Sequence, residues 1–294
     1  MTTANKTAKT IEAVYAPPPQ HWVGDGFPVR GYFSHIPKGM RRLSPFLLMD
    51  YAPPHDFAPT ENLRRGVGPH PHRGFETVTI AFQGSVAHYD STGSGDVIHP
   101  GDVQWMTAGS GILHREYHAP EFARKGGPFQ MAQIWVNLPA KDKMTEPGYQ
   151  AITAGQMGVV DLPKGRVRVI AGEYRGTKGP AHTFSPINLF DFELQSGGQA
   201  EFDFPASWNT GLLVMAGTVK VNGQPARQDE FVLFGHEGES IKVEAEADAR
   251  LLLLNGEPIN EPVANYGPFV MNTPAEIETA IRDFQTGKFG HLDE

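Results

Sequence analysis

Short apolar runs alternate with turns along most of this 294-residue chain. The runs are rich in β-branched and aromatic residues, and glycine or proline separates most of them, which is the pattern of β-strands joined by tight turns. They fall at residues 46–50, 77–82, 85–89, 102–106 and 133–136, and then at 167–170, 187–192, 211–214, 218–221, 231–234, 241–243 and 251–254. Many short strands of this kind predict an all-β fold of closed or sandwiched antiparallel barrels.

The strand pattern is interrupted by a polar segment rich in glycine and proline, which we interpret as a linker between two domains. Residues 214–219 repeat the strand, turn and strand pattern of residues 81–86, which suggests a duplicated barrel. The expected organisation is a flexible N-terminal arm at 1–24, a first barrel domain at 25–145, a linker at 146–165, a second barrel domain at 166–260 and a tail at 261–294.

The tail carries the signature of one short helix. Thr273 and Pro274 are typical of the N-cap and the first helical position, and an acidic residue follows in the first turn. Gly287 suits the residue after the helix. The expected helix has one apolar stripe, which needs a partner surface and which consists of Ile277, Ile281 and Phe284.

The composition narrows the classes of function. The formal net charge of -8 argues against a general binder of nucleic acids or anionic membranes, whose phosphates attract basic residues. The chain has no cysteine, so any transition metal must be held by nitrogen and oxygen ligands. The N-terminal segment lacks the apolar core of a signal peptide, and no run reaches the roughly 18 apolar residues of a membrane-spanning helix. We therefore expect a cytoplasmic protein.

Two pairs of potential metal ligands lie about forty residues apart. His70 and His72 alternate with prolines, and only one residue separates His114 from Glu116. Alternate residues of a strand project to the same face, so each pair presents two side chains in one direction. Two facing pairs would supply three imidazoles and one carboxylate to a single divalent transition metal. Such a ligand set suits Fe(II), Mn, Ni, Cu(II) or Zn, and leaves positions open for a substrate.

Glu76 competes with Glu116 for the role of carboxylate ligand. It follows His72 by four positions and would share its face if the strand ran straight. Gly74 lies between them and invites a bend that would break this parity, so we prefer Glu116.

The histidines are concentrated in the expected first domain, where nine of the twelve precede residue 146. This bias indicates that the chemistry belongs to that domain. His118 shares the parity of the second ligand pair and is a candidate for orienting a ligand. Four isolated histidines are interpreted as structural, namely His88, His99, His182 and His236.

The two ligand motifs resemble those of the pirin family within the cupin superfamily. The resemblance rests on Pro-His-Pro-His-Arg-Gly-Phe-Glu-Thr-Val at 69–78 and on Gly-Asp-Val-Gln-Trp-Met-Thr-Ala-Gly-Ser-Gly-Ile-Leu-His-Arg-Glu at 101–116. It extends to residues 44–50 and 266–272, and so covers most of the chain after about residue 25. It implies two antiparallel β-barrel cupin domains and one metal, usually iron, in the first. The implied ligands are His70, His72, His114 and Glu116.

The resemblance also implies a function. Bacterial relatives of this type resemble quercetin 2,3-dioxygenases, which open a flavonol ring with O2 and release carbon monoxide. In that interpretation Glu116 is the catalytic base that takes the proton of the substrate hydroxyl. A different enolic compound is an alternative substrate. A competing hypothesis is a metal-bearing protein that does no chemistry and binds a protein partner, as eukaryotic pirins that act as transcription cofactors are expected to do.

Overall fold

The computed structural model describes residues 6–293, which form two compact units. The N-terminal unit contains, of the described residues, 18–41, 45–155 and 259–293. The C-terminal unit contains, of the described residues, 6–17, 42–44 and 156–258. Nearly all regular structure in both units is β, which agrees with the all-β prediction.

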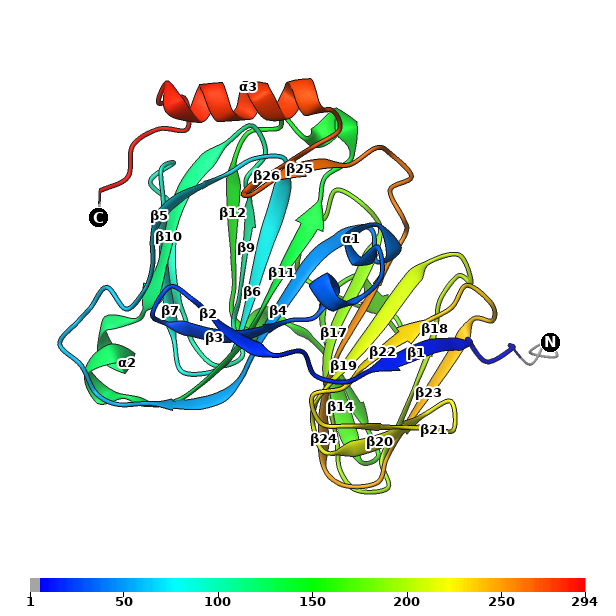
Figure 1. Ribbon diagram of the computed structural model, residues 1–294. Helices are drawn as coiled ribbons and strands as arrows, with labels where there is room; N and C mark the ends of the chain where they lie inside the picture. Colours follow the sequence, from blue (N-terminus) through cyan, green and yellow to red (C-terminus); the bar gives the residue numbers. More distant parts are fainter. Residues whose placement is uncertain (1–5, 294) are drawn as a thin grey trace. The chain divides into compact units, whose positions relative to one another are not determined.

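The N-terminal unit is built mainly of two sheets that face each other (Figure 1). All strand pairs in both sheets are antiparallel. The larger sheet has the order β12 (Gly148–Ile152), β9 (Val103–Thr107), β6 (Phe75–Gln83), β11 (Gly127–Asn137), β4 (Phe46–Phe57), β3 (Phe27–Gly31) and β2 (Gln20–Val23). The smaller sheet has the order β5 (Gly66–His72), β10 (Ile112–His118), β7 (Val86–Asp90) and β8 (Gly95–Ile98).

The C-terminal unit repeats this plan. Its larger sheet has the order β1 (Ile11–Tyr15), β22 (Phe231–Phe234), β19 (Asn209–Ala216), β24 (Ala249–Gly256), β17 (Ile187–Leu194), β14 (Gly165–Ala171) and β13 (Gly158–Leu162). Its smaller sheet has the order β18 (Gln199–Asp203), β23 (Ser240–Ala245), β20 (Thr218–Val221) and β21 (Gln224–Arg227). A short hairpin is added by β15 (Glu173–Tyr174) and β16 (Thr177–Lys178).

Eight consecutive strands, β4 to β11 and β17 to β24, occupy equivalent places in the two units. When the eight strands of each unit are numbered along the chain, the order across both smaller sheets is second, seventh, fourth and fifth. Within the described residues each unit keeps its larger and smaller sheets separate, so of the closed and sandwiched barrels that the sequence predicts it has the sandwiched form. Left-handed turns at Gly84 and Gly217 carry the chain from the larger sheet into the smaller one.

Two segments expected to be irregular contain strands. The expected N-terminal arm includes β1, which pairs with β22 of the C-terminal unit, and β2, which pairs with β3 of the N-terminal unit. The expected linker at 146–165 includes β12 and β13, which lie in different units. Polar composition at a sheet edge resembles that of a linker, because an edge strand exposes one side to water. Residues 1–5 of the expected arm lie outside the described residues.

The helices are short and lie between or after the strands. The longest is α3 (Pro274–Gln285), which begins with a capping box between Thr273 and Glu276, as the tail sequence predicts. The other helices are α1 (Gly39–Arg42), α2 (Pro120–Lys125) and the 3-10 turns Phe33–His35, Ala140–Asp142 and Ala154–Gln156. The described residues include no helix that is long and apolar enough to cross a membrane.

The tail belongs to the N-terminal unit. The hairpin of β25 (Ala264–Tyr266) and β26 (Phe269–Met271) precedes α3, and the helix lies along it (Figure 1). Ile277 and Phe289 pack against Phe269, and Leu113 of β10 joins the same apolar cluster. The helix therefore packs mainly on this hairpin and on Leu113, with Ile277 buried and Phe284 40% exposed, which agrees with the prediction that it packs on a barrel domain.

Candidate metal centre

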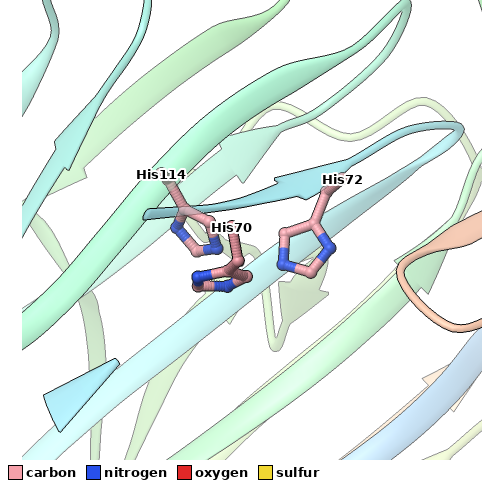
Figure 2. Close-up of side chains that lie close together, drawn as sticks. All are labelled: His70, His72 and His114. Carbon is pink, nitrogen blue, oxygen red and sulfur yellow. The ribbon is translucent and has the colours of Figure 1, made fainter. Parts of the chain in front are cut away.

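Three imidazoles meet between the two sheets of the N-terminal unit. His70 and His72 alternate on β5, and His114 lies on β10 directly opposite His70. The ring centroids are 4.2 Å apart for His70 and His114, and 4.8 Å apart for His72 with each of the other two. One nitrogen of each ring lies within 4.8 Å of a nitrogen of the others, as the rings gather in Figure 2. Strand parity therefore located this cluster correctly.

The other nitrogens of these rings fix their orientation. His70 Nδ1 lies 2.8 Å from the carbonyl of Gly68, and His72 Nδ1 lies 3.4 Å from that of Pro268. A carbonyl accepts only from N–H, so both rings carry their proton on Nδ1 and leave Nε2 free. His114 Nε2 is buried and has no hydrogen-bond partner among residues 6–293. The buried lone pair of His114, together with the free Nε2 atoms of His70 and His72, fits a divalent transition metal.

The surroundings of His72 and His114 disfavour protonation of these two imidazoles. Burial lowers the pKa of His72 well below its usual value, and the neighbouring His70 lowers it further. Burial and the adjacent His70 and His72 act in the same way on the pKa of His114. Neutral imidazole is the form that binds metals, so His72 and His114 are ready to act as donors at neutral pH.

Glu116 lies beside this cluster but belongs to a group of potential ligands that shares only His114 with it. It forms this second group with His88 and His114, in which one ligand atom of each of the three lies within 4.8 Å of the others. Along β10, His114 faces His70 and Ile112 faces His72, so Glu116 lies on the far side of His114 from His72. Glu116 faces Val67, which shows that β5 contains a bulge between the two pairs, and simple parity does not anticipate this extra residue.

Glu116 is held by side chains of the larger sheet that the sequence did not single out. Gln104 Nε2 donates to Oε1 at 2.6 Å, and Thr79 Oγ1 donates to the same oxygen at 3.2 Å. Gln133 Nε2 donates to Oε2 at 2.8 Å. These donors lie directly opposite one another on β6, β9 and β11. The available signal was polar residues at inward positions of otherwise apolar strands.

His88, one of the four histidines that the sequence predicted to be structural, also lies beside this site. It lies on β7 opposite Glu116, and its Nδ1 is 3.3 Å from Nδ1 of His114. Its ring stacks on Tyr149 with centroids 4.9 Å apart. The signal in the sequence was His88-x-Asp90, a pair with the same alternation as the two recognised ligand pairs.

Glu76 is not part of either group of potential metal ligands. Gly74 has a φ of +87°, and β6 begins only after it, so the expected bend breaks the parity with His72. The carboxylate accepts a hydrogen bond from Thr107 at 2.8 Å. Burial raises the pKa of Glu76 to about 7, against the opposing hydrogen bond from Thr107.

His118 is likewise separate from the imidazole cluster. Its Nε2 lies 2.9 Å from the carbonyl of Gly26, and its ring stacks on Phe129 with centroids 4.8 Å apart. Burial lowers the pKa of His118 to about 4. The structure thus places it in an aromatic part of the core, where it orients no candidate ligand through a hydrogen bond.

The C-terminal tail supports the strand that carries the first two histidines. Arg73 Nη1 donates to Asp283 of α3 at 3.0 Å, and its Nε donates to the carbonyl of Ser110 at 2.7 Å. A Cβ on Gly74 would lie 2.0 Å from the carbonyl oxygen of Val270, so only glycine fits beside the tail. The tail therefore fixes the end of β5 as well as the ring of His72.

A cavity of about 250 Å³ opens beside the imidazoles. His70, His72 and Glu116 contribute to one side of it. Burial raises the pKa of Asp50, a second carboxylate on the wall, to about 6, although nearby His21 lowers it. The rest of the lining is mostly apolar and consists of Val23, Phe27, Val29, Val67, Met131, Gln133 and Trp135. The site therefore combines a metal-ligand cluster with room for a small, largely apolar molecule.

Comparison with known proteins places this arrangement in a family. A profile described as Pirin matches residues 26–136, and one described as Pirin C-terminal cupin domain matches residues 189–290. A Pseudomonas aeruginosa protein provisionally named a quercetin 2,3-dioxygenase is 49% identical over 283 residues, which cover 96% of this chain and 98% of that protein. Pirin-like protein 2 of Arabidopsis thaliana is 39% identical over 279 residues, which cover 91% of this chain and 81% of that protein.

A solved structure agrees with these matches. The crystal structure of a protein described as quercetin 2,3-dioxygenase from Acinetobacter baumannii superposes with a TM-score of 0.93 at 50% identity. The match covers 98% of this chain and 100% of that one. The prediction of two cupin domains is thereby confirmed.

Proposed function

This chain belongs to the pirin family of two-domain cupin proteins, and from that premise we propose that it is a metal-dependent dioxygenase acting on a flavonol or a related enolic compound. The observation that carries the proposal is the convergence of His70, His72 and His114 beside the apolar cavity. The names of the two bacterial relatives, both at about half identity, support the choice of a quercetin-like substrate.

In the proposed site, His70, His72 and His114 hold one divalent metal, with Fe(II) as the first candidate and Glu116 as the fourth ligand. A metal so held supplies Lewis acidity toward a substrate hydroxyl and lets O2 react beside the substrate. Mn, Ni, Cu or Zn would also suit this donor set.

The other steps of the proposed reaction depend on side chains in and around the cavity. Glu116 takes the proton of the substrate hydroxyl, and Gln104, Gln133 and Thr79 keep its carboxylate in place while it does so. Phe27, Met131 and Trp135 give the cavity flat apolar walls, which would hold a planar aromatic substrate and exclude water from the reacting atoms. We propose that the protein acts in the cytoplasm, in keeping with its lack of cysteine.

The test is an assay of O2 consumption and carbon monoxide release with quercetin, using protein loaded with Fe(II). We expect turnover by the wild type and its loss in His72→Ala, because that variant removes one of the three converging imidazoles. His118→Ala is the matched control, since it removes a buried imidazole of the same unit that lies outside the cluster. Absence of turnover in the iron-loaded wild type, with metal-dependent binding of a protein partner instead, would refute the enzymatic proposal.

A further inference from the structure

We propose that Asp90 and His88 are positioning residues that act in series on His114 and hold its Nε2 lone pair toward the imidazole cluster. The inference rests on the metal site of the proposed function, because it explains how one of the proposed ligands is oriented. It assigns a role to two buried groups that take no part in the proton transfer proposed for Glu116.

Asp90, His88 and His114 form a continuous, buried chain of hydrogen bonds. His88 Nδ1 lies 3.3 Å from Nδ1 of His114, and His88 Nε2 lies 3.3 Å from Oδ2 of Asp90. His88 and His114 have no exposed surface, and Asp90 is 3% exposed. A hydrogen bond between two nitrogens contains one proton, so one of the two facing Nδ1 atoms donates and the other accepts.

Asp90 determines which atom donates and which accepts in each of these hydrogen bonds. Its Oδ1 accepts hydrogen bonds from Thr92 N at 2.8 Å, from Thr92 Oγ1 at 2.6 Å and from Ser94 N at 3.3 Å. A carboxylate fixed by these donors accepts from His88, which must then carry its proton on Nε2. The Nδ1 of His88 is left as an acceptor, so His114 donates from Nδ1 and keeps Nε2 free.

This arrangement differs from those of the two neighbouring imidazoles. His70 and His72 each donate to a backbone carbonyl, whereas His114 donates to a second imidazole backed by a carboxylate. Partners of this kind fix the tautomer of a ligating histidine and raise its basicity. The stacked ring of Tyr149, inclined by 17° to that of His88, limits rotation of the intermediate ring.

Asp90→Asn is the decisive variant, because it reverses the direction of the hydrogen bonds through His88 to His114 with little change in the shape of the side chain. The donors from Thr92 and Ser94 hold the carbonyl oxygen of the new amide at the Oδ1 position, so its NH2 faces His88 Nε2. His88 must then carry its proton on Nδ1, and His114 must shift its own proton to Nε2. We expect imidazole 15N NMR of the metal-free protein to show both shifts, and Ni²⁺ titration to give an affinity about 10–100-fold lower.

A second pair of variants separates positioning from general stability. In His88→Asn the side-chain oxygen can still accept from His114 Nδ1, whereas His88→Leu offers no acceptor. We expect His88→Asn to keep more of the Ni²⁺ affinity than His88→Leu, and His118→Leu, a buried histidine outside the chain, to keep all of it. The proposal is overturned if Asp90→Asn retains the Nδ1–H form of His114, or if His88→Leu binds Ni²⁺ as tightly as the wild type. Neither measurement depends on flavonol turnover, so failure here is distinct from failure of the proposed enzymatic function.

Discussion

The space between the two sheets is polar in the N-terminal unit and apolar at the same positions in the C-terminal unit. If Ala81 and Val86 are aligned with Val214 and Val219 across the shared strand–turn–strand pattern, the strand pairings relate seven inward residues of the N-terminal unit to seven of the C-terminal unit. The resulting pairs are His70 with Phe202, Thr79 with Leu212, His88 with Val221, Gln104 with Val232, His114 with Ile241, Glu116 with Val243 and Gln133 with Leu253.

All seven counterparts in the C-terminal unit belong to one apolar core cluster. The same backbone plan therefore supports either a packed core or a cluster of imidazoles and a carboxylate with their hydrogen-bonding partners. Burying polar groups costs free energy unless each finds a partner, so this cluster requires the surrounding amides and carboxylates. The difference between the units lies in a connected set of side chains and not in the four proposed ligands alone.

The largest effect on stability is expected from the apolar side of this comparison. Phe202 packs on Phe190 and Phe204, with ring centroids 5.8 Å and 6.2 Å away. Phe202→Ala should lower the free energy of unfolding by about 3–5 kcal/mol, because it leaves a cavity in a packed core. Its counterpart His70→Ala should cost less than about 1 kcal/mol in the metal-free protein, since it removes an imidazole from a cluster of like groups. Urea unfolding checks both, and equal losses would contradict the contrast.

A large effect on metal binding is expected when the C-terminal residue is transferred into the N-terminal site. His114→Ile introduces the residue found at the equivalent position, Ile241, in a place that a branched apolar side chain can fill. Ni²⁺ affinity should fall by at least about 100-fold, since loss of a residue behind a ligand alone costs 10–100-fold. Isothermal titration calorimetry measures the affinity, and circular dichroism checks that the variant folds. An affinity within threefold of wild type would exclude His114 as a ligand.

A smaller effect is expected from the amides that hold Glu116. Gln133→Leu, which copies Leu253, removes the donor to Oε2 while preserving the approximate shape of the side chain. We expect kcat/KM for quercetin to fall by about 10–100-fold, because the carboxylate loses its fixed orientation. Gln130→Leu is the control, since Gln130 is buried on the same strand and donates to Tyr51. Similar losses in the two variants would indicate a general effect on β11.

The sequence predicted the parts of this comparison that depend on neighbouring residues. Alternation within β5 and β10 identified His70, His72 and His114, and the cap of α3 was recognised from Thr273 and the residues after it. Long-range pairing was not accessible in this way. His88 reaches His114 only through the register of β7 with β10, and the bulge opposite Glu116 is invisible to a simple alternation.

The same limit applies to contacts between distant segments. The strand β1 pairs with β22 more than two hundred residues later, and Pro268 of the tail orients His72. Neither segment carries a local signal of its partner. Family resemblance supplied what local pattern could not, because it places all these segments in one known arrangement.

The smallest predicted effect concerns Asp50, whose equivalent in the C-terminal unit is Phe190. Burial raises the pKa of this carboxyl from 3.8 to about 6, against the lowering effect of His21, so between these pH values the folded state binds more protons than the unfolded state. Stability contributed by this group is therefore lost as the pH rises from about 4 to about 6 and stays constant above that. The whole shift corresponds to roughly 3 kcal/mol, but the side chain is only partly buried, and screening by solvent reduces the expected change to about 1 kcal/mol.

Asp50→Asn removes this titration. Its free energy of unfolding, measured in urea at a series of pH values, should therefore rise relative to that of the wild type between pH 4 and pH 6. Asp161→Asn, at an exposed position of the C-terminal unit, is the control and should run parallel to the wild type. Parallel curves for Asp50→Asn would mean that this carboxyl stays ionised in the cavity at acidic pH. The cavity would then hold a permanent second negative charge facing the imidazoles, and its polar side would differ from the apolar core of the C-terminal unit even more than the present geometry indicates.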